Sequence, residues 1–390
     1  MKNRQRRARY KSGTCPGKNK YLSGERIRPL AINGRETIFS LVDQTFLAYN
    51  GGRLRECCRL YAEKMLKEEV TIGMSLAGAL TPAGMGCSCI VPLIKAGFVD
   101  WIVSTGANLY HDLHFAFDCA LHTGNAGVDD TDLKKKGIVR IYDVFFDMQS
   151  CLFRTDDILK SILSQTDFQR EMGTAELHYL IGKYAAAYEE SNNLRNVSIL
   201  AAAYRAGVPV FTPSPGDSTI GMNIAALNLE GSELNINPSI DVNETAAIVL
   251  AAKRSRGKSA VVLIGGGSPK NFMLQTEPQI QEILKLKELG HDYFLQITDA
   301  RPDTGGLSGA TPSEAVSWGK VDPAQLPDTV VCYTDSTIAL PIITHYTLVK
   351  SKKRKLKRLY RQRKKLVENM KKEYRRKHGS HKEAVTEGIP

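Results

Sequence analysis

Short runs rich in β-forming residues alternate with helical stretches along most of this 390-residue chain, and this alternation limits the folds open to it. We predict six strands, at residues 70–74, 101–104, 208–212, 260–264, 293–297 and 330–333. The predicted helical stretches include 34–68, 109–122, 172–190 and 278–289. Strands that alternate with helices favour a mostly parallel sheet with helices on both faces. The sequence therefore predicts an α/β fold.

Small or polar residues follow several of the predicted strands. They lie at 104–107, 265–267, 298–299 and 334–335. Ligands of open parallel sheets bind beyond the carboxyl ends of the strands, so we expect a site at this edge. The three glycines at 265–267 allow a ligand to approach the backbone, but they equally suit a tight turn and do not form the G-x-G-x-x-G fingerprint. Asp217 and Asp335 are binding candidates or, alternatively, turn and helix-cap residues.

A segment near the C-terminal third has the pattern of a short capped helix. Thr311, Pro312 and Glu314 fit the cap, the first and the third helical positions. Gly319 can end the helix in a left-handed turn. The sequence therefore predicts a helix of about two turns that stops at this glycine.

Lys320 follows that helix directly and lies near an indole and a carboxylate. Glu314 and Trp318 are four residues apart and share one helical face. A lysine against aromatic surface loses solvation, which lowers its pKa and frees its amine to attack a carbonyl or imine. The alternative is an ordinary surface helix with a packed tryptophan and a solvated lysine.

The positive charge of the chain is concentrated at its C-terminal end. The chain as a whole has a formal charge of +12, yet residues 350–390 hold 17 Lys and Arg residues and four acidic residues. The remainder is close to neutral, with 36 basic and 37 acidic residues. Residues 349–390 therefore form a basic tail, predicted to be either an amphipathic helix that binds RNA, a ribosome or an anionic surface, or a solvated and partly disordered extension.

The cysteines and the apolar runs indicate a cytoplasmic protein. The eight cysteines are scattered, and Cys87 and Cys89 have one residue between them rather than the two of zinc motifs, so we predict reduced thiols and no metal site. No apolar run reaches the length of a membrane helix. Residues 1–30 are basic and are predicted to form a loose arm.

The string from Ser308 to Lys320, Ser-Gly-Ala-Thr-Pro-Ser-Glu-Ala-Val-Ser-Trp-Gly-Lys, resembles the active-site signature of the deoxyhypusine synthase family. The resemblance extends over roughly residues 30–347. It implies a Rossmann-like domain over 31–348 that binds NAD without the usual fingerprint. It also implies that Lys320 carries a covalent imine, and that the protein is a homo-oligomer, most simply a tetramer, with active sites between subunits.

The same resemblance implies a set of cofactor-binding positions at the strand ends. The matching residues are Ser75, Ser104, Thr105, Gly106, Asp217, Thr298, Asp303, Ser308, Thr334 and Asp335. For the amine substrate it implies Glu314, Trp318, Asn271, Asp303 and His111. The alternative for the turn at His111 and Asp112 is an ordinary histidine beside a helix cap.

Several positions depart from the family pattern around the amine. Asn271, after Pro269-Lys270, replaces a histidine, and Gln275 replaces an asparagine. Leu307 replaces an acid, and Met222 stands where the family has a second acid about five residues after Asp217. A dicationic amine in a closed pocket needs negative partners, so these changes predict an altered amine pocket. Asp299 and Asp303 are nearby candidates for compensation.

The sequence therefore predicts an NAD-dependent transferase that moves an aminobutyl group from a polyamine to an amine acceptor through Lys320. The acceptor is a protein lysine, as in deoxyhypusine synthesis, or a small diamine such as putrescine, as in homospermidine formation. A protein of another class remains open: a non-catalytic NAD-binding protein whose tail docks on RNA.

Overall fold

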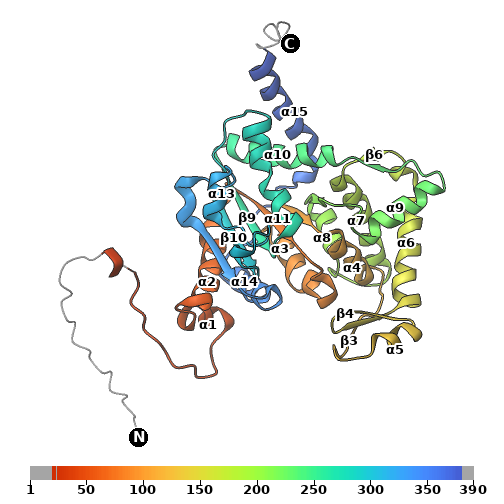
Figure 1. The fold of residues 1–390 in the computed structure, drawn as a ribbon, viewed down its shortest axis with the longest axis horizontal. Coiled ribbons are helices and arrows are strands. Elements are labelled where there is room, and N and C mark those ends of the chain that lie inside the picture. The colour runs from red at the N-terminus through yellow and green to blue at the C-terminus, as the bar shows by residue number, and fades with distance from the viewer. Residues whose placement is uncertain (1–19, 23, 380–390) are drawn as a thin grey trace.

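A central sheet of parallel strands confirms the predicted α/β class (Figure 1). The computed structural model of the protein describes residues 20–22 and 24–379. The strands of the central sheet lie in the order β11–β10–β9–β1–β2–β7, and each neighbouring pair is parallel. Their bounds are β1 Val70–Leu76, β2 Trp101–Ser104, β7 Val210–Phe211, β9 Lys258–Ile264, β10 Tyr293–Thr298 and β11 Thr329–Tyr333.

All six predicted strands are present, although the boundaries of some elements differ from those predicted. The strand predicted at 208–212 is only two residues long. Thr212 leaves the strand pairing because its N–H donates to Thr174 Oγ1 and its hydroxyl donates to the carbonyl of Ser104. The helix predicted at 109–122 is α4, Gly106–Ala116, and the chain leaves it through Asp118, which has a φ of 56°. The helix predicted at 278–289 ends at Ile283.

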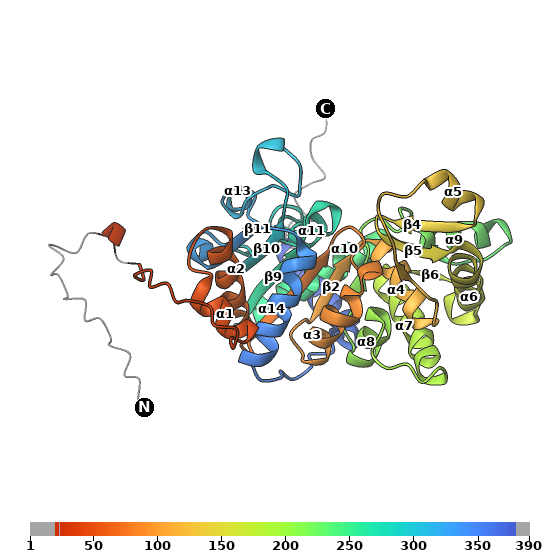
Figure 2. The same cartoon turned by 90° about the horizontal axis from the view of Figure 1, so that it is seen from below.

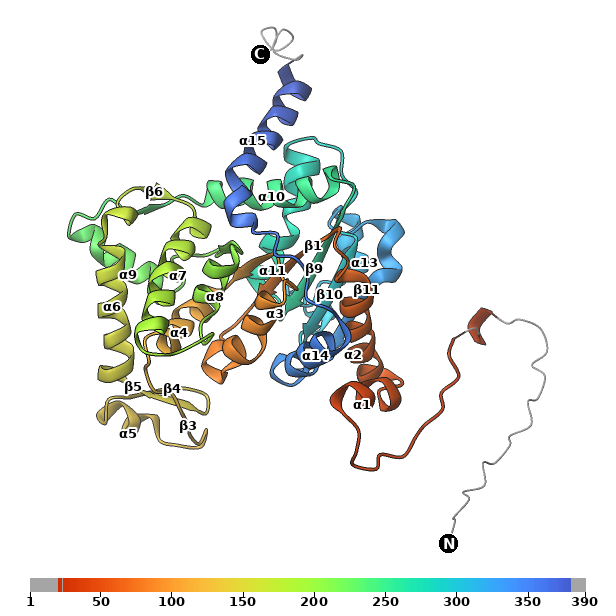
Figure 3. The ribbon, with the colours of Figure 1, turned by 180° about the vertical axis from the view of Figure 1, so that it is seen from behind.

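Helices cover both faces of the sheet (Figures 2 and 3). The apolar side chains that alternate along the strands pack into one core on each face. Helices α2 and α14 contribute to the first core, and α10 and α11 to the second. Gly73 on β1 makes room for Trp101, because a β-carbon at this glycine would lie 2.5 Å from the indole. The helices around the sheet are α1 Ile38–Thr45, α2 Tyr49–Arg59, α3 Val91–Lys95, α10 Pro238–Arg254, α11 Gly267–Leu274, α12 Thr276–Pro278, α13 Pro312–Ser317, α14 Ser336–Lys350 and α15 Leu359–His378.

A further group of helices lies beyond the β7 edge of the sheet (Figure 3). These helices are α4, α5 Asp130–Lys135, α6 Arg154–Leu163, α7 Thr174–Ser191, α8 Ile199–Ala206 and α9 Thr219–Leu229. An antiparallel sheet, in the order β3–β5–β4, accompanies them, as does a parallel pair of strands. The bounds of these strands are β3 His122–Thr123, β4 Ile138–Ile141, β5 Val144–Asp147, β6 Glu171–Met172 and β8 Asn235–Ile236.

The described part of the N-terminal arm extends away from the sheet (Figure 1). A short 3-10 turn spans Lys20–Leu22, and residues 24–35 are exposed. The rest of the arm predicted at 1–30 lies outside the described residues. Within residues 20–22 and 24–379, no helix is long and apolar enough to cross a membrane, and no group of His, Cys, Asp and Glu is placed to hold a metal ion.

The basic tail forms an extended segment followed by the amphipathic helix α15. This helix contacts the body as far as Glu373, which pairs with Arg254, and its last residues are mostly exposed. Arg354 is buried and donates to the carbonyl of Val70 and to Asp100. Tyr360 at the start of α15 stacks on Tyr179 with ring centroids 3.5 Å apart. The alternative of a solvated, disordered extension therefore does not hold for this segment, because its apolar stripe and selected cations find partners on the body. Residues 380–390 lie outside the described part.

Arg363 makes the most informative of these tail contacts, since it is buried between two carboxylates. Its guanidinium lies 3.1 Å from Glu244 on α10 and 3.4 Å from Glu176 on α7. Burial raises the pKa of Glu244 to about 7, and the charge of Arg363 opposes that shift. We predict that Arg363→Ala lowers the free energy of unfolding by about 3 kcal/mol, because Glu244 is left buried without its partner.

The pH dependence of this loss has a definite sign. The pKa of Glu244 in the folded protein lies above its unfolded value and rises further without Arg363, so stability is lost as pH increases through the interval between the two values. The variant should therefore lose more stability at pH 8 than at pH 5 in urea denaturation. Lys364→Ala, on the exposed side of the same helix, is the matched control. Equal behaviour of the two variants would contradict a docked tail.

Candidate active site at the carboxyl ends of the strands

Two loops at the carboxyl end of the sheet are bound to one another. The N–H of Gly267, after β9, donates to Ser308 Oγ at 2.9 Å. Gln296 on β10 donates from Nε2 to the carbonyls of Gly265 at 3.0 Å and Ser308 at 2.8 Å. A β-carbon on Gly266 would lie 2.4 Å from Ser308 Cα, so the close approach of the loops requires glycine. These contacts fix the loop that leads into α13.

Lys270 on α11 supports the same loop from below, and its side chain is only 2% exposed. Its Nζ donates to Gln296 Oε1 at 3.0 Å, to the Ser308 carbonyl at 3.3 Å and to the Ala310 carbonyl at 2.7 Å. Burial lowers the pKa of Lys270 to about 8. The sequence analysis gave this lysine no role, because nothing in its local pattern distinguishes a buried lysine from a surface one.

Helix α13 places Lys320 just past its end, and the predicted capping is confirmed. Thr311 Oγ1 accepts from the N–H of Glu314 at 3.2 Å, and Gly319 has the left-handed φ of 66°. The N–H of Lys320 then donates to the Ala315 carbonyl at 2.9 Å, which closes the last turn. The local geometry that presents the lysine is therefore fixed by backbone hydrogen bonds.

The Lys320 side chain is partly buried beside polar and aromatic groups. Its Nζ donates to Asn271 Oδ1 at 3.2 Å and lies 5.8 Å from the centroid of the Trp318 ring. Burial lowers the pKa of Lys320, and the carboxylates of Glu314 and Glu282 oppose this shift. A lowered pKa increases the fraction of neutral amine, which is the nucleophilic form.

A cavity of about 340 Å³ opens at Lys320, within the size range of small-molecule sites. Its walls combine apolar side chains with two lysines, two glutamates and two amides. The lining residues are Lys270, Asn271, Leu274, Gln275, Pro278, Glu282, Leu307, Ala310, Glu314, Ala315, Trp318 and Lys320. The cavity therefore offers an apolar channel with a partly desolvated amine and negative charge, which suits an alkyl amine.

A buried polar layer lies behind the turn at Lys320. Gln281 donates from Nε2 to the Gly319 carbonyl at 2.7 Å and to Glu277 Oε2 at 3.1 Å, and the N–H of His291 donates to the Lys320 carbonyl at 3.0 Å. Burial raises the pKa of Glu277 to about 8 and lowers that of His291 to about 3. His291 is therefore neutral near pH 7, so its 3.9 Å contact with Glu277 is not an ion pair. This layer was not predicted from the sequence.

The predicted cofactor residues on β1 and β2 lie at the same edge of the sheet. Ser75 is fully buried, and its Oγ has no hydrogen-bond partner among the described residues. Thr105 caps α4 and donates to the Gly78 carbonyl at 2.6 Å, and Ser104 is buried beside it. A β-carbon on Gly106 would lie 2.4 Å from the Ser218 side chain, so the loop of Asp217 closes over this helix start.

The remaining predicted cofactor residues differ in exposure: Thr298 is buried, whereas the aspartates are exposed. Thr298 at the end of β10 accepts through its carbonyl from the N–H of Thr334 at 3.1 Å. Asp335 caps α14, with Oδ1 accepting from the Thr337 N–H at 2.7 Å, so the alternative of a helix cap is observed. Asp303 is exposed and paired with Arg301, and Asp217 is exposed in a turn. A buried serine hydroxyl without a partner and glycine turns open to solvent fit a nucleotide cofactor.

Some predicted residues do not reach the cavity at Lys320 within one chain. His111 donates to or accepts from His114 at 3.0 Å, and burial lowers its pKa to about 4. Asp112 is buried and accepts from the N–H groups of Ile199 and Leu200, so it caps α8 rather than its own helix. Met222, expected near the amine, is 65% exposed on α9 and does not line the cavity.

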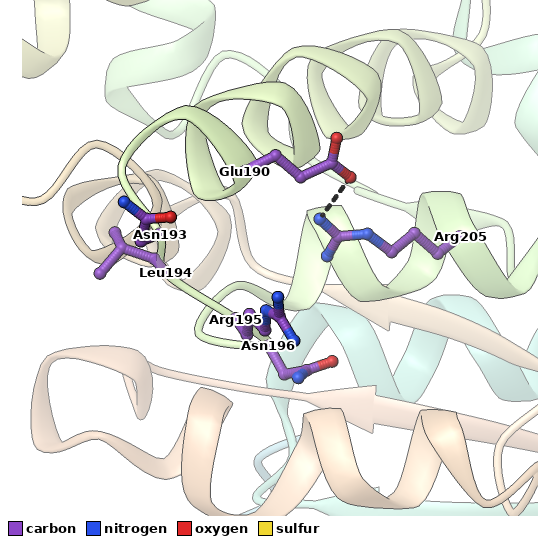
Figure 4. Close-up of a pocket in the computed structure, with 6 residues that line it drawn as sticks. All are labelled: Glu190, Asn193, Leu194, Arg195, Asn196 and Arg205. Carbon is purple, nitrogen blue, oxygen red and sulfur yellow. Dashed lines mark hydrogen bonds and ion pairs between the residues drawn. The ribbon is translucent and has the colours of Figure 1, made fainter.

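A second hollow lies apart from this edge, at the end of α7 (Figure 4). It has a volume of about 420 Å³ and is lined by Glu190, Asn193, Leu194, Arg195, Asn196 and Arg205. Arg205 and Glu190 face one another across it at 3.4 Å. It holds none of the predicted site residues, and its Arg205 is already paired with Glu189 and Glu190, so the chemistry of the chain is better sought at Lys320.

A parallel sheet flanked by helices, with a partly desolvated lysine at its carboxyl edge, defines an α/β fold with a candidate active site at the strand ends. The family model for deoxyhypusine synthase matches residues 39–347. The chain therefore belongs to the deoxyhypusine synthase family, a family of transferases.

Individual relatives agree with this assignment. The chain is 56% identical over 351 residues to the deoxyhypusine synthase-like protein of Nostoc punctiforme, covering 90% of each. It is 36% identical over 317 residues to the "Probable deoxyhypusine synthase 2" of Methanosarcina acetivorans, covering 81% of this chain and 88% of that protein. A crystal structure of an Entamoeba histolytica protein with a provisional deoxyhypusine synthase assignment shares the fold, with a TM-score of 0.54 at 15% identity over 85% of this chain and 100% of that one.

The role of Lys270 as a support for the loop leads to a stability prediction. Lys270→Met removes the donor from three buried oxygens and should lower the free energy of unfolding by about 1–3 kcal/mol at pH 7. The pKa of Lys270 in the folded parent, about 8, is below the unfolded value of about 10.4, so this group makes the parent more stable as pH rises from 8 to 10.

The gap between parent and Lys270→Met should therefore widen in urea denaturation at pH 9.5. Lys287→Met, which removes an exposed lysine nearby, is the control and should change little. A Lys270→Met protein as stable as the parent at both pH values would show that the lysine does not support the loop.

Proposed function

We propose that the protein is an NAD-dependent aminobutyl transferase in which Lys320 carries the transferred group as an imine. The observation that supports this most is the position of Lys320. Its amine is partly desolvated, has one hydrogen-bond partner and opens into a cavity lined by Trp318 and Glu314. Burial also lowers the pKa of Lys270, but its ammonium is held by three oxygens in the wall and is less accessible.

We propose that NAD lies along the edge formed by Ser75, Ser104, Thr105, Gly106 and Asp217. The remaining proposed contacts are Thr298, Asp303, Ser308, Thr334 and Asp335. When bound, NAD would accept a hydride from the carbon beside the donor nitrogen and return it at the end of the cycle. Ser75 and the glycine turns support this position, since the Ser75 hydroxyl has no partner among the described residues and a β-carbon on Gly78, Gly267 or Gly305 would meet only open space.

The transfer itself would use the neutral amine of Lys320. Nζ adds to the imine carbon of the oxidised donor, the departing nitrogen takes up a proton, and its bond to that carbon breaks. The four-carbon group then remains on Lys320 as an imine. An acceptor amine adds to the same carbon, Lys320 leaves with a proton, and hydride reduces the new imine to an amine.

Neighbouring side chains would orient the amine and exclude water. Glu314 would pair with a substrate ammonium, and Trp318 would cover the alkyl chain at the mouth of the cavity, where its ring is 57% exposed. Asn271 would hold Lys320 through the observed hydrogen bond. Exposed apolar groups at the mouth, Trp318 and Leu307, support our proposal that a second subunit covers it.

A small diamine is the acceptor that we favour over a protein lysine. The observation behind this choice is the altered wall, where Leu307 and Asn271 stand in place of the acid and the histidine of the family pattern. Labelled acceptors discriminate directly: transfer to putrescine without transfer to a lysine-containing protein substrate supports the choice, and the reverse result contradicts it.

Replacement of the carrier lysine is the main test of the proposed chemistry. Lys320→Arg keeps the positive charge but provides no neutral amine, so transfer should fall on the order of 10³-fold or more. Affinity for NAD, measured by calorimetry on the full chain, should be unchanged. Transfer that persists in this variant would rule out Lys320 as the carrier, and loss of NAD binding would show that the replacement acts on the cofactor edge instead.

The quaternary structure gives an independent test. We expect a homotetramer, because the family resemblance implies active sites between subunits, and the exposed apolar residues at the cavity mouth are compatible with a covering surface. Light scattering should give about four times the 43.1 kDa chain mass. A monomer at micromolar concentration would contradict this expectation and would leave the cavity open.

A further inference from the structure

The cavity at Lys320 contains a carboxylate that no sequence signal indicated. Glu282 lies on the turn η7, Gln279–Ile283, which precedes α13 in the sequence. Its side chain lines the same cavity as residues of α13. Its side chain makes no hydrogen bond or ion pair with any residue of the described ranges, whereas most acids near it, such as Glu277 and Glu288, are engaged in the buried layer. Glu282 is therefore free to receive a ligand cation.

The charge of Glu282 acts on the reactive lysine. Together with Glu314, it opposes the lowering of the Lys320 pKa that burial causes. The two glutamates come from separate elements, η7 and α13, and they are the only acids that line this cavity in the described part of the chain. Apolar groups from Leu274, Pro278 and Trp318 complete the lining.

We propose that Glu282 is a specificity-determining residue that binds one ammonium of a linear diammonium substrate, while Glu314 binds the other. The two carboxylates come from different elements and can each pair with an ammonium, and the apolar lining of the same cavity can contact methylene groups. This arrangement matches a short alkane with a charged nitrogen at each end. This assignment rests on the proposed function and names its substrate class. It also supplies the compensating acid that the sequence analysis sought at Asp299 and Asp303, neither of which lines the cavity.

The position of Glu282 follows from the segment that braces Lys320. Gln281, its neighbour, is bound to the Gly319 carbonyl, and Pro278 lines the cavity one turn earlier. The same short segment therefore fixes the backbone of the reactive turn and presents the carboxylate. Because Glu282 is itself exposed, its contribution should be moderate and reduced by salt.

Amine binding to the NAD-loaded full chain tests this assignment without requiring turnover. Glu282→Gln should weaken binding of 1,4-diaminobutane by roughly five- to tenfold, and should leave butylamine, which has one ammonium, nearly unchanged. The difference should shrink between 50 mM and 500 mM salt, as screening of a cavity-mouth pair requires. Glu282→Asp keeps the charge and should recover part of the affinity.

Glu233→Gln is the matched control, because it removes an exposed carboxylate that does not line the cavity. An unchanged diamine affinity in Glu282→Gln, an equal loss for butylamine, or no binding of the diamine to the parent would each overturn the assignment. If the folding of Glu282→Gln is impaired, Glu282→Asp is compared for the two amines: a loss of affinity confined to the diamine supports the assignment, and an equal loss for butylamine contradicts it.

The pH profile of transfer gives a signature that a purely structural role would not produce. The charged groups that face Lys320 are Glu314 on α13, Glu282 on η7 and Lys270 on α11. Removal of one of the two negative charges should lower the pKa of Lys320 further and move the acidic limb of the profile to lower pH. An unmoved limb would count against Glu282 acting at the reactive centre.

These measurements separate the two proposals. Selective loss of diamine binding in Glu282→Gln, with no labelled Lys320 after reduction, supports the amine site and overturns the transferase. Labelled Lys320 with unchanged diamine binding in Glu282→Gln does the reverse.

Discussion

The contact between the turn after β9 and the loop after β10 is the constraint on which the candidate site depends. Ser308 joins the two through its hydroxyl and carbonyl, and Gln296 and Lys270 hold the same carbonyl from the sheet and from α11. Helix α13 begins four residues later, at Pro312, so its orientation follows from this contact. If the loop moved, Lys320 would lose its hydrogen bond to Asn271, and the residues of α13 would no longer line the cavity.

The electrostatics of the cavity follow from burial acting against nearby charge. Burial lowers the pKa of both Lys270 and Lys320, while the charges of Glu314 and Glu282 raise the pKa of Lys320 and so oppose part of that shift. The two lysines nevertheless differ in what they can do. Lys270 is enclosed by oxygen acceptors and suits a structural role, whereas Lys320 has a single acceptor and access to the cavity. Accessibility, rather than the size of the pKa shift, separates a support from a nucleophile.

Much of the fold was predictable because it follows local rules. The strand at 101–104 was predicted with its observed bounds, and the cap at Thr311 and the turn at Gly319 were found where their residue types require them. The family resemblance, now shown over residues 39–347, is the source of the prediction that Lys320 is the carrier, and that role stays a prediction. The roles given to the cofactor residues and to His111 stay predictions.

The features that were not predictable depend on long-range contacts. Lys270 is buried only because the 308–310 carbonyls arrive 38 to 40 residues later in the chain, and Glu282 reaches the cavity because η7 ends early and packs beside Gly319. Arg363 of the tail pairs with Glu176 and Glu244, which lie on distant helices. The charge pattern of the tail does not reveal these partners, and by itself it favoured a solvated extension. In each case a charged side chain gains its role from partners that sequence proximity does not reveal.

Chemical trapping of the imine tests the central claim most directly. The full chain would be incubated with NAD and spermidine labelled in its butyl group, reduced with borohydride, digested, and its peptides identified by mass. The account predicts label on the peptide that contains Lys320, dependent on NAD and absent from Lys320→Arg. No NAD-dependent label, or label on Lys270 instead, would contradict it.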